Sequence, residues 1–262
     1  MRRLAIFFAV LIGPGMAAIA APAADRIEAL IAAYPDHLAG REGNDLIWRD
    51  GTRMPIDDGR QKNHDDRLDD GDIEDSLSQV YPLGDCSFAP PAFNFEPGRI
   101  RSTPFFMKMY GASESAARAS TTTIPWFDGR VRVTTVNGVD QRLQAVARDL
   151  AALGPKFRPF LNKSGGAFNW RVIAGTSRPS VHSFGAAIDI DTGFSDYWRW
   201  KMGKDGKVGG YANRIPREIV EVFEAHGFVW GGKWYHYDTM HFEYRPELIA
   251  IGQAEGRCAA GH

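Results

Sequence analysis

Two short stretches of the sequence hold side chains that could bind a metal ion and activate water. The stretch SVHSFGAAIDID (180–191) places His182, Asp189 and Asp191 among small and apolar residues. The stretch WYHYDTMHFEY (234–244) adds further imidazole and carboxylate groups, at His236, Asp238, His241 and Glu243. Zinc in hydrolases usually takes three protein ligands from His, Asp and Glu and keeps a fourth position for water. The residue types therefore predict hydrolysis by a metal-activated water.

Four of these residues can divide the roles of a zinc hydrolase between them. We expect His182, Asp189 and His241 to be the metal ligands. Asp238 is the candidate general base, because a carboxylate near the metal can take the proton of the attacking water. The sequence contains no G-x-S-x-G elbow, so a serine nucleophile is not predicted.

The neighbouring residues leave alternatives open. Asp191 and Glu243 could orient a ligand histidine or make structural hydrogen bonds. His236 is an alternative ligand, or a hydrogen-bond donor to the transition state. Gly185 and Ala187 are small either because backbone approaches the metal or substrate closely, or because the packing is tight.

The spacing of these residues resembles the signature of a known peptidase family. The pattern reads Ser180-x-His182-x-x-Gly185-x-Ala187-x-Asp189, followed later by Asp238-x-x-His241. It is similar to the M15 family of zinc peptidases, which includes D-alanyl-D-alanine carboxypeptidases, dipeptidases, and phage endolysins that cut the L-alanyl-D-glutamate bond. The stretch WGGKWYHYDTMHFEY resembles the endolysin-type branch in particular. The resemblance covers residues 128–246.

The resemblance implies the same three Zn²⁺ ligands and the same base. Other branches of the family place glutamate at the base position, whereas Asp238 is shared with the endolysin-type branch. The family also uses an arginine near the strand before the first ligand, which holds the scissile carbonyl and its developing oxyanion. Arg171 is our candidate for this role, and Arg178 is the alternative because it lies closer to His182 in the sequence.

The substrates implied by the resemblance are the stem peptides of peptidoglycan. A D,D-carboxypeptidase must recognise a free carboxylate, and an endopeptidase needs an open groove; the sequence does not choose between these bonds, nor does it predict an oligomeric state. The alternative function is a non-catalytic zinc-containing module that binds the cell wall or a partner. The intact Asp238 argues against it, because a purely structural site has no use for a base.

The elements that must position these residues are clearest after Gly129. Alternating apolar residues predict strands, and apolar residues at helical spacing predict helices. On one of the strands, Asp189 and Asp191 would share a face. Because strands and helices do not alternate strictly, we expect an α+β fold, in which a small, largely antiparallel sheet with flanking helices carries the zinc site. The strands are expected at 130–136, 170–176, 186–192, 228–232 and 241–244, and the helices at 139–153 and 216–226.

The first half of the chain is patterned less regularly. Residues 25–34 have apolar side chains at helical spacing and predict a short helix. Residues 49–77 are acidic, rich in turn residues and unlike a calcium-binding loop, so we expect a solvated loop. Residues 86–111 are rich in proline and aromatic residues and should wrap over the surface of a core formed elsewhere. The fold should therefore carry an irregular N-terminal extension.

The chain opens with the features of a secretory signal peptide. The basic start MRR is followed by an apolar stretch at 4–12 and by an Ala-x-Ala cleavage pattern that ends at Ala20 or Ala23. An uncleaved membrane helix is the alternative, but the apolar run is short and nothing later is apolar for long enough to span. We expect a periplasmic or secreted protein with no membrane span after cleavage.

These features divide the chain into four parts. They are a signal peptide (1–23), an N-terminal extension that wraps the core (24–127), an M15-like zinc peptidase domain (128–250) and a C-terminal tail (251–262). The formal net charge is −1 and the sequence has no basic stripe with interleaved aromatic residues, so nucleic acid is not an expected partner. Cys86 and Cys258 could form a disulfide in an oxidising compartment, and a reactive thiol is the alternative.

Overall fold

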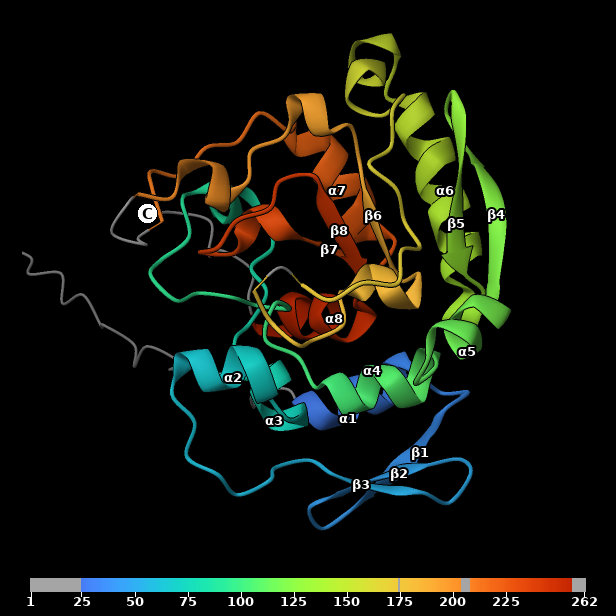
Figure 1. The fold of residues 1–262 in the computed structure, drawn as a ribbon, viewed down its shortest axis with the longest axis vertical. Coiled ribbons are helices and arrows are strands. Elements are labelled where there is room, and N and C mark those ends of the chain that lie inside the picture. Colours follow the sequence, from blue (N-terminus) through green and yellow to red (C-terminus); the bar gives the residue numbers. More distant parts are fainter. Residues whose placement is uncertain (1–24, 174, 204–207, 256–262) are drawn as a thin grey trace, which may run out of the picture.

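A computed structural model describes residues 25–173, 175–203 and 208–255 (Figure 1). The expected signal peptide and Cys258 lie outside the described residues, so the cleavage site and the disulfide stay predictions. Within the described ranges, no helix combines the length and the apolar character needed to cross a bilayer.

The strands of the described ranges form three small sheets, in which every pairing is antiparallel. The central sheet has the strand order β6-β8-β7 and carries the metal-binding candidates. This mixture of helices with small antiparallel sheets confirms the expected α+β class. The strands are β1 Leu38–Glu42, β2 Asp45–Trp48, β3 Arg53–Pro55, β4 Thr121–Trp126, β5 Gly129–Thr134, β6 Ala187–Asp189, β7 Phe228–Trp230 and β8 His241–Tyr244.

Helices surround this sheet. Figure 1 shows α6 along the β4–β5 hairpin and α8 below the central sheet, where α8 contacts both α1 and β7. The α-helices are α1 Arg26–Ala33, α2 His64–Asp70, α3 Ile73–Leu77, α4 Thr103–Tyr110, α5 Glu114–Ala119, α6 Val139–Ala152, α7 Arg217–Ala225 and α8 Pro246–Glu255. Short 3-10 turns lie at Asp85–Phe88, Val136–Gly138, Pro155–Phe160, Val181–Phe184, Thr192–Phe194, Trp198–Lys201 and Gly231–Lys233.

Helical spacing predicted the long helices correctly because their apolar residues do face the core. In α6 the residues Val139, Leu143, Val146 and Leu150 are buried, and α1 and α7 also form where they were expected. Burying each such side chain contributes roughly 1.5–3 kcal/mol. The strands expected around 130–136, 186–192, 228–232 and 241–244 are also present.

The strand expected at 170–176 was wrong. Among the described residues of this region, only an isolated bridge between Val172 and Pro179 forms, and the Val172 side chain is 53% exposed. Instead of a neighbouring strand, the buried Ser183 hydroxyl satisfies Arg171: it accepts from Arg171 N at 2.9 Å and donates to Arg171 O at 2.7 Å. Two backbone hydrogen bonds complete the local pairing, from Ser180 N to Arg171 O and from Ile173 N to Arg178 O, both at 2.9 Å. The stretch thus pairs with the turn that follows it and with a side chain, and not with another strand.

The solvated loop expected at 49–77 contains α2 and α3. Each helix begins with a capping box, formed by Asn63 with Asp66 and by Asp72 with Asp75. Such boxes satisfy backbone N–H groups that have no partner within the helix. The Lys62 ammonium lies 2.7–2.8 Å from three carboxylates of this region, so the acidic residues cap helices and pair with a cation.

The segment 86–111 does not merely wrap over the surface. Its helix α4 buries Phe105, Phe106, Met109 and Tyr110. The rings of Phe106 and Tyr110 lie 5.7 and 6.2 Å from that of Phe184, which belongs to the turn that carries His182. The boundary suggested at residue 127 falls in the turn of the β4–β5 hairpin. The two parts of the chain therefore share one continuous core.

Candidate metal centre

Three expected ligands meet at one end of the paired strands β6 and β8. His182 lies in the 3-10 turn Val181–Phe184, which begins with a hydrogen bond from His182 N to the Ser180 hydroxyl. Asp189 ends β6 and His241 begins β8, and the antiparallel register places these two residues directly opposite each other. The donor atoms are 3.0–3.2 Å apart: His182 Nε2, His241 Nδ1 and Asp189 Oδ1.

The hydrogen bonds of the two imidazoles aim both free lone pairs at the same point. His182 Nδ1–H donates to the Ala167 carbonyl at 2.7 Å, which leaves His182 Nε2 as an acceptor. His241 Nε2–H donates to the buried Glu243 carboxylate at 3.3 Å, which leaves His241 Nδ1 as an acceptor. A cation shared by the three atoms would satisfy both lone pairs and the carboxylate oxygen at once.

The spacing of the donor atoms fits a tetrahedral metal. Zinc bonds of about 2.0–2.2 Å at tetrahedral angles put neighbouring ligand atoms roughly 3.3 Å apart. The observed 3.0–3.2 Å between His182, Asp189 and His241 is close to this value. The electrostatics of the site also favour a bound cation. Burial lowers the pKa of His241, but the hydrogen bonds to Asp189 and Glu243 have the larger effect and raise this pKa to about 10. The surroundings thus favour positive charge at this point.

Asp238 is held beside the ligands by the backbone of its loop. Asp238 N donates to Gly231 O at 3.0 Å, and His241 N donates to Asp238 O at 3.2 Å. A Cβ on Gly231 would lie 2.6 Å from Asp238 O, so this approach requires glycine. Burial and the neighbouring Asp189 raise the pKa of Asp238 to about 6. Its Oδ1 is buried and has no hydrogen-bond partner among the residues that the structure describes.

A pocket of about 100 Å³ joins Asp238 to the metal-binding candidates. Arg171 lines this pocket together with His182, Asp238 and His241. Arg178 is not among the described residues that line it; its side chain is buried, and its Nε lies 3.9 Å from Asp69 Oδ1. Arg171 is therefore the better placed of the two arginines.

The structure gives Asp191, Glu243 and Gly185 different roles. Asp191 is not on the strand face, because β6 ends at Asp189; it accepts from Gly193 N at 2.8 Å and caps a turn. Glu243 accepts a hydrogen bond from the candidate ligand His241, which fits the alternative that it orients a ligand histidine. Gly185 reflects tight packing, since its φ is +68° and a Cβ would lie 2.8 Å from Thr134 N.

Sequence reasoning missed the contribution of the N-terminal part to this pocket. Arg99 and Arg101 line it, and the buried Arg101 also donates to Pro179 O at 2.6 Å, beside the turn that carries His182. The available signal was the charged run EPGRIR within a segment otherwise rich in proline and aromatic residues. Local pattern gave no indication of where this segment packs.

Replacing Glu243 by glutamine should lower zinc affinity about 10- to 100-fold, the usual cost of changing a residue that hydrogen-bonds a ligand histidine. Glutamine keeps the size of Glu243 but not the negative charge that makes His241 a better donor. Competition with a chromophoric chelator would measure the change. Glu221→Gln, at an exposed ion pair with Arg217, is the control. Unchanged affinity in Glu243→Gln would contradict the role given to Glu243.

Residues 174–244 match the family model described as D-alanyl-D-alanine carboxypeptidase, which belongs to the M15 peptidases. The matched stretch contains the three candidate ligands and Asp238, whereas Arg171 lies just before it. Neither the curated proteins nor the solved structures gave a match to the chain.

Proposed function

We propose, on the match of residues 174–244 to a family model of the M15 peptidases, that the chain is an exported, zinc-dependent peptidase that hydrolyses the stem peptides of peptidoglycan. The observation that supports this most is the cluster of three donors at His182, Asp189 and His241, 3.0–3.2 Å apart. Both histidines line one pocket with Asp238, whose Oδ1 has no hydrogen-bond partner among the described residues. A purely structural metal site would not need that additional carboxylate.

The residues of the pocket divide the chemistry between them. Zinc held by the three donors would lower the pKa of a bound water toward about 7. Asp238, whose pKa lies near 6, would take the proton of the attacking water and pass it to the leaving amine. The Arg171 guanidinium would hold the scissile carbonyl and neutralise the charge that develops on its oxygen.

The charge of the pocket favours a substrate that ends in a free carboxylate. Arg99, Arg101 and Arg171 all line it. Burial, with nearby Arg178, lowers the pKa of Arg101 to about 9, so this cation lacks full compensation. In the described part of the chain, Arg101 Nε has no hydrogen-bond partner. Guanidinium groups bind carboxylates through paired hydrogen bonds, so we propose removal of a terminal D-alanine rather than cleavage within the stem.

Mass spectrometry of muropeptides before and after incubation with the zinc-loaded protein tests this proposal. We expect pentapeptide stems to lose one alanine, and a matched stem peptide with a C-terminal amide to stay uncut. His182→Ala should be inactive on both, because it removes a ligand. Cleavage within the stem or a cross-link would instead indicate an endopeptidase. No cleavage despite bound zinc would favour the non-catalytic binding module.

A further inference from the structure

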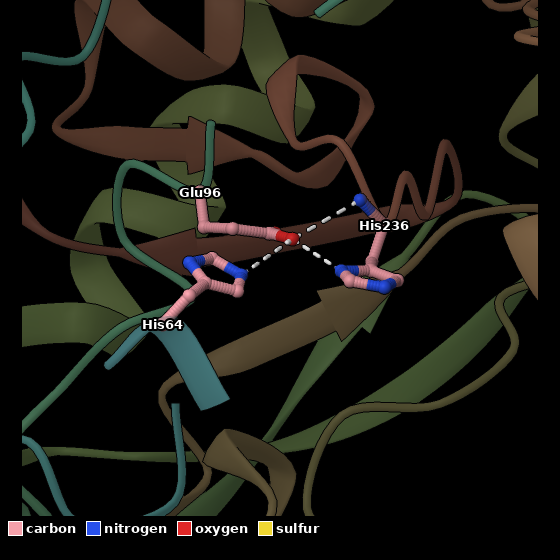
Figure 2. Close-up of side chains that lie close together, drawn as sticks. All are labelled: His64, Glu96 and His236. Atoms are coloured by element: carbon pink, nitrogen blue, oxygen red, sulfur yellow. Dashed lines mark hydrogen bonds and ion pairs between the residues drawn. The ribbon is translucent and has the colours of Figure 1, made fainter. Parts of the chain in front are cut away.

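A second group of potential metal ligands lies outside the pocket of Asp238. His64 begins α2, Glu96 precedes α4, and His236 lies in the loop before β8. One donor atom from each residue lies within 4.8 Å of the other two. Figure 2 shows both imidazoles directed at the same oxygen of Glu96, with His64 Nε2 at 3.9 Å and His236 Nδ1 in hydrogen-bond contact.

The contacts within this group leave buried donor atoms without hydrogen bonds. The Glu96 side chain has no exposed surface, yet its Oε2 has no hydrogen-bond partner in the described ranges, and the nearest cation is Arg99 Nε at 3.6 Å. The buried His64 Nε2 likewise has no hydrogen-bond partner within them. Buried polar atoms are normally paired, so the His64 nitrogen, 3.9 Å from Glu96 Oε1, is available to a metal ion that the Glu96 carboxylate would share.

The backbone around Glu96 holds the group in place. Glu96 N donates to Gln79 Oε1 at 2.5 Å, and Tyr235 N donates to Phe95 O at 2.7 Å. His236 N also donates to Glu96 Oε1 at 3.3 Å. Two of the three donors, Glu96 and His236, therefore lie on chain segments that are already fixed against each other, and His64 approaches them from α2.

The site is open to solvent on one side and is distinct from the catalytic candidate. His64 and His236 line a surface hollow of about 410 Å³, and no described residue that lines this hollow also lines the pocket of Asp238. Their side chains are 17% and 19% exposed, so both imidazoles reach the wall of this hollow. The donor set of two imidazoles and one carboxylate is one that zinc accepts.

We propose that His64, Glu96 and His236 bind a second zinc ion, which fastens the N-terminal part of the chain to the loop that carries Asp238. Arg99, three residues after Glu96, lines the catalytic pocket, and Asp238 follows His236 by two residues. An ion at this point would thus fix two segments that contribute to the pocket. The inference concerns metal binding and stands apart from the peptidase activity.

The test is the number of zinc ions per chain, measured by elemental mass spectrometry on the whole mature protein after zinc loading and removal of free metal. We expect two in the wild type, and one in each of His64→Gln, His236→Gln and His182→Gln. His226→Gln is the matched control, because His226 is 18% exposed and contacts the single carboxylate of Asp149. It should retain two.

The single variants separate this inference from the proposed function. If His64→Gln and His236→Gln both keep the wild-type number of ions, the second site does not exist. If the wild type holds one ion that only His182→Gln removes, the second site is likewise refuted while the catalytic centre stands. If His64→Gln and His236→Gln each lose one ion, the second site is supported. Activity retained in His182→Gln would overturn the catalytic assignment, but it would leave that conclusion about the second site unchanged.

Discussion

Replacement of Asp238 by asparagine is expected to lower kcat/KM by about 10²- to 10⁴-fold, the range that general acid–base catalysis supplies. Asparagine keeps the shape of the side chain but cannot take up a proton at neutral pH. The backbone hydrogen bonds of Asp238 to Gly231 and His241 do not involve its carboxylate, so the loop should keep its conformation. Release of alanine from a pentapeptide stem would measure the loss, and zinc content should stay unchanged.

Asp191→Asn is the matched control for this measurement. Asp191 is close to the ligands in the sequence, but it caps a turn, and asparagine can accept the same hydrogen bond from Gly193 N. We expect activity close to that of the wild type. If Asp238→Asn kept more than about one tenth of the activity, the loss would be smaller than any expected for removal of a general base. Another group would then have to be the base.

Replacement of Arg245 by methionine should lower the free energy of unfolding by about 3–5 kcal/mol, because it leaves buried carboxylates without their cation. Arg245 is 1% exposed. Its guanidinium donates to Glu247 at 2.5 Å, to Gly98 O at 2.9 Å and to Glu243 at 3.4 Å. Urea unfolding would report the loss as a lower midpoint.

Arg118→Met provides the comparison for Arg245→Met. Arg118 forms an ion pair with Glu114 one helical turn away, and both side chains are about half exposed. Exposed pairs of this kind contribute roughly 0.3–0.5 kcal/mol. A loss in Arg245→Met no larger than that in Arg118→Met would mean that Glu243 and Glu247 find other partners or become protonated.

The metal-binding candidates could be predicted from the sequence because short-range rules govern them. Alternation placed Asp189 and His241 on strands, and antiparallel pairing of those strands brings the two side chains together. Helical spacing predicted α6 and α7 for the same reason, since each buries one apolar face. These features depend on a few neighbouring residues.

The features that could not be predicted depend on contacts between distant residues. Alternation suggested a strand around Val172, but the Ser183 hydroxyl took up the backbone of Arg171 instead. Acidic composition suggested a loop at 49–77, although two of its acidic residues complete capping boxes. Arg99 and Arg101 reach the pocket through a loop whose course is set by packing, which the local sequence does not encode.

The shared core also constrains when the protein can fold. Tyr34, which directly follows α1, donates to Glu247 at 2.7 Å, and Gly98 O accepts from Arg245. The N-terminal half therefore lacks essential partners until the last strand and helix have been synthesised. A ribosome-bound chain therefore cannot complete this core while its C-terminal part is still missing.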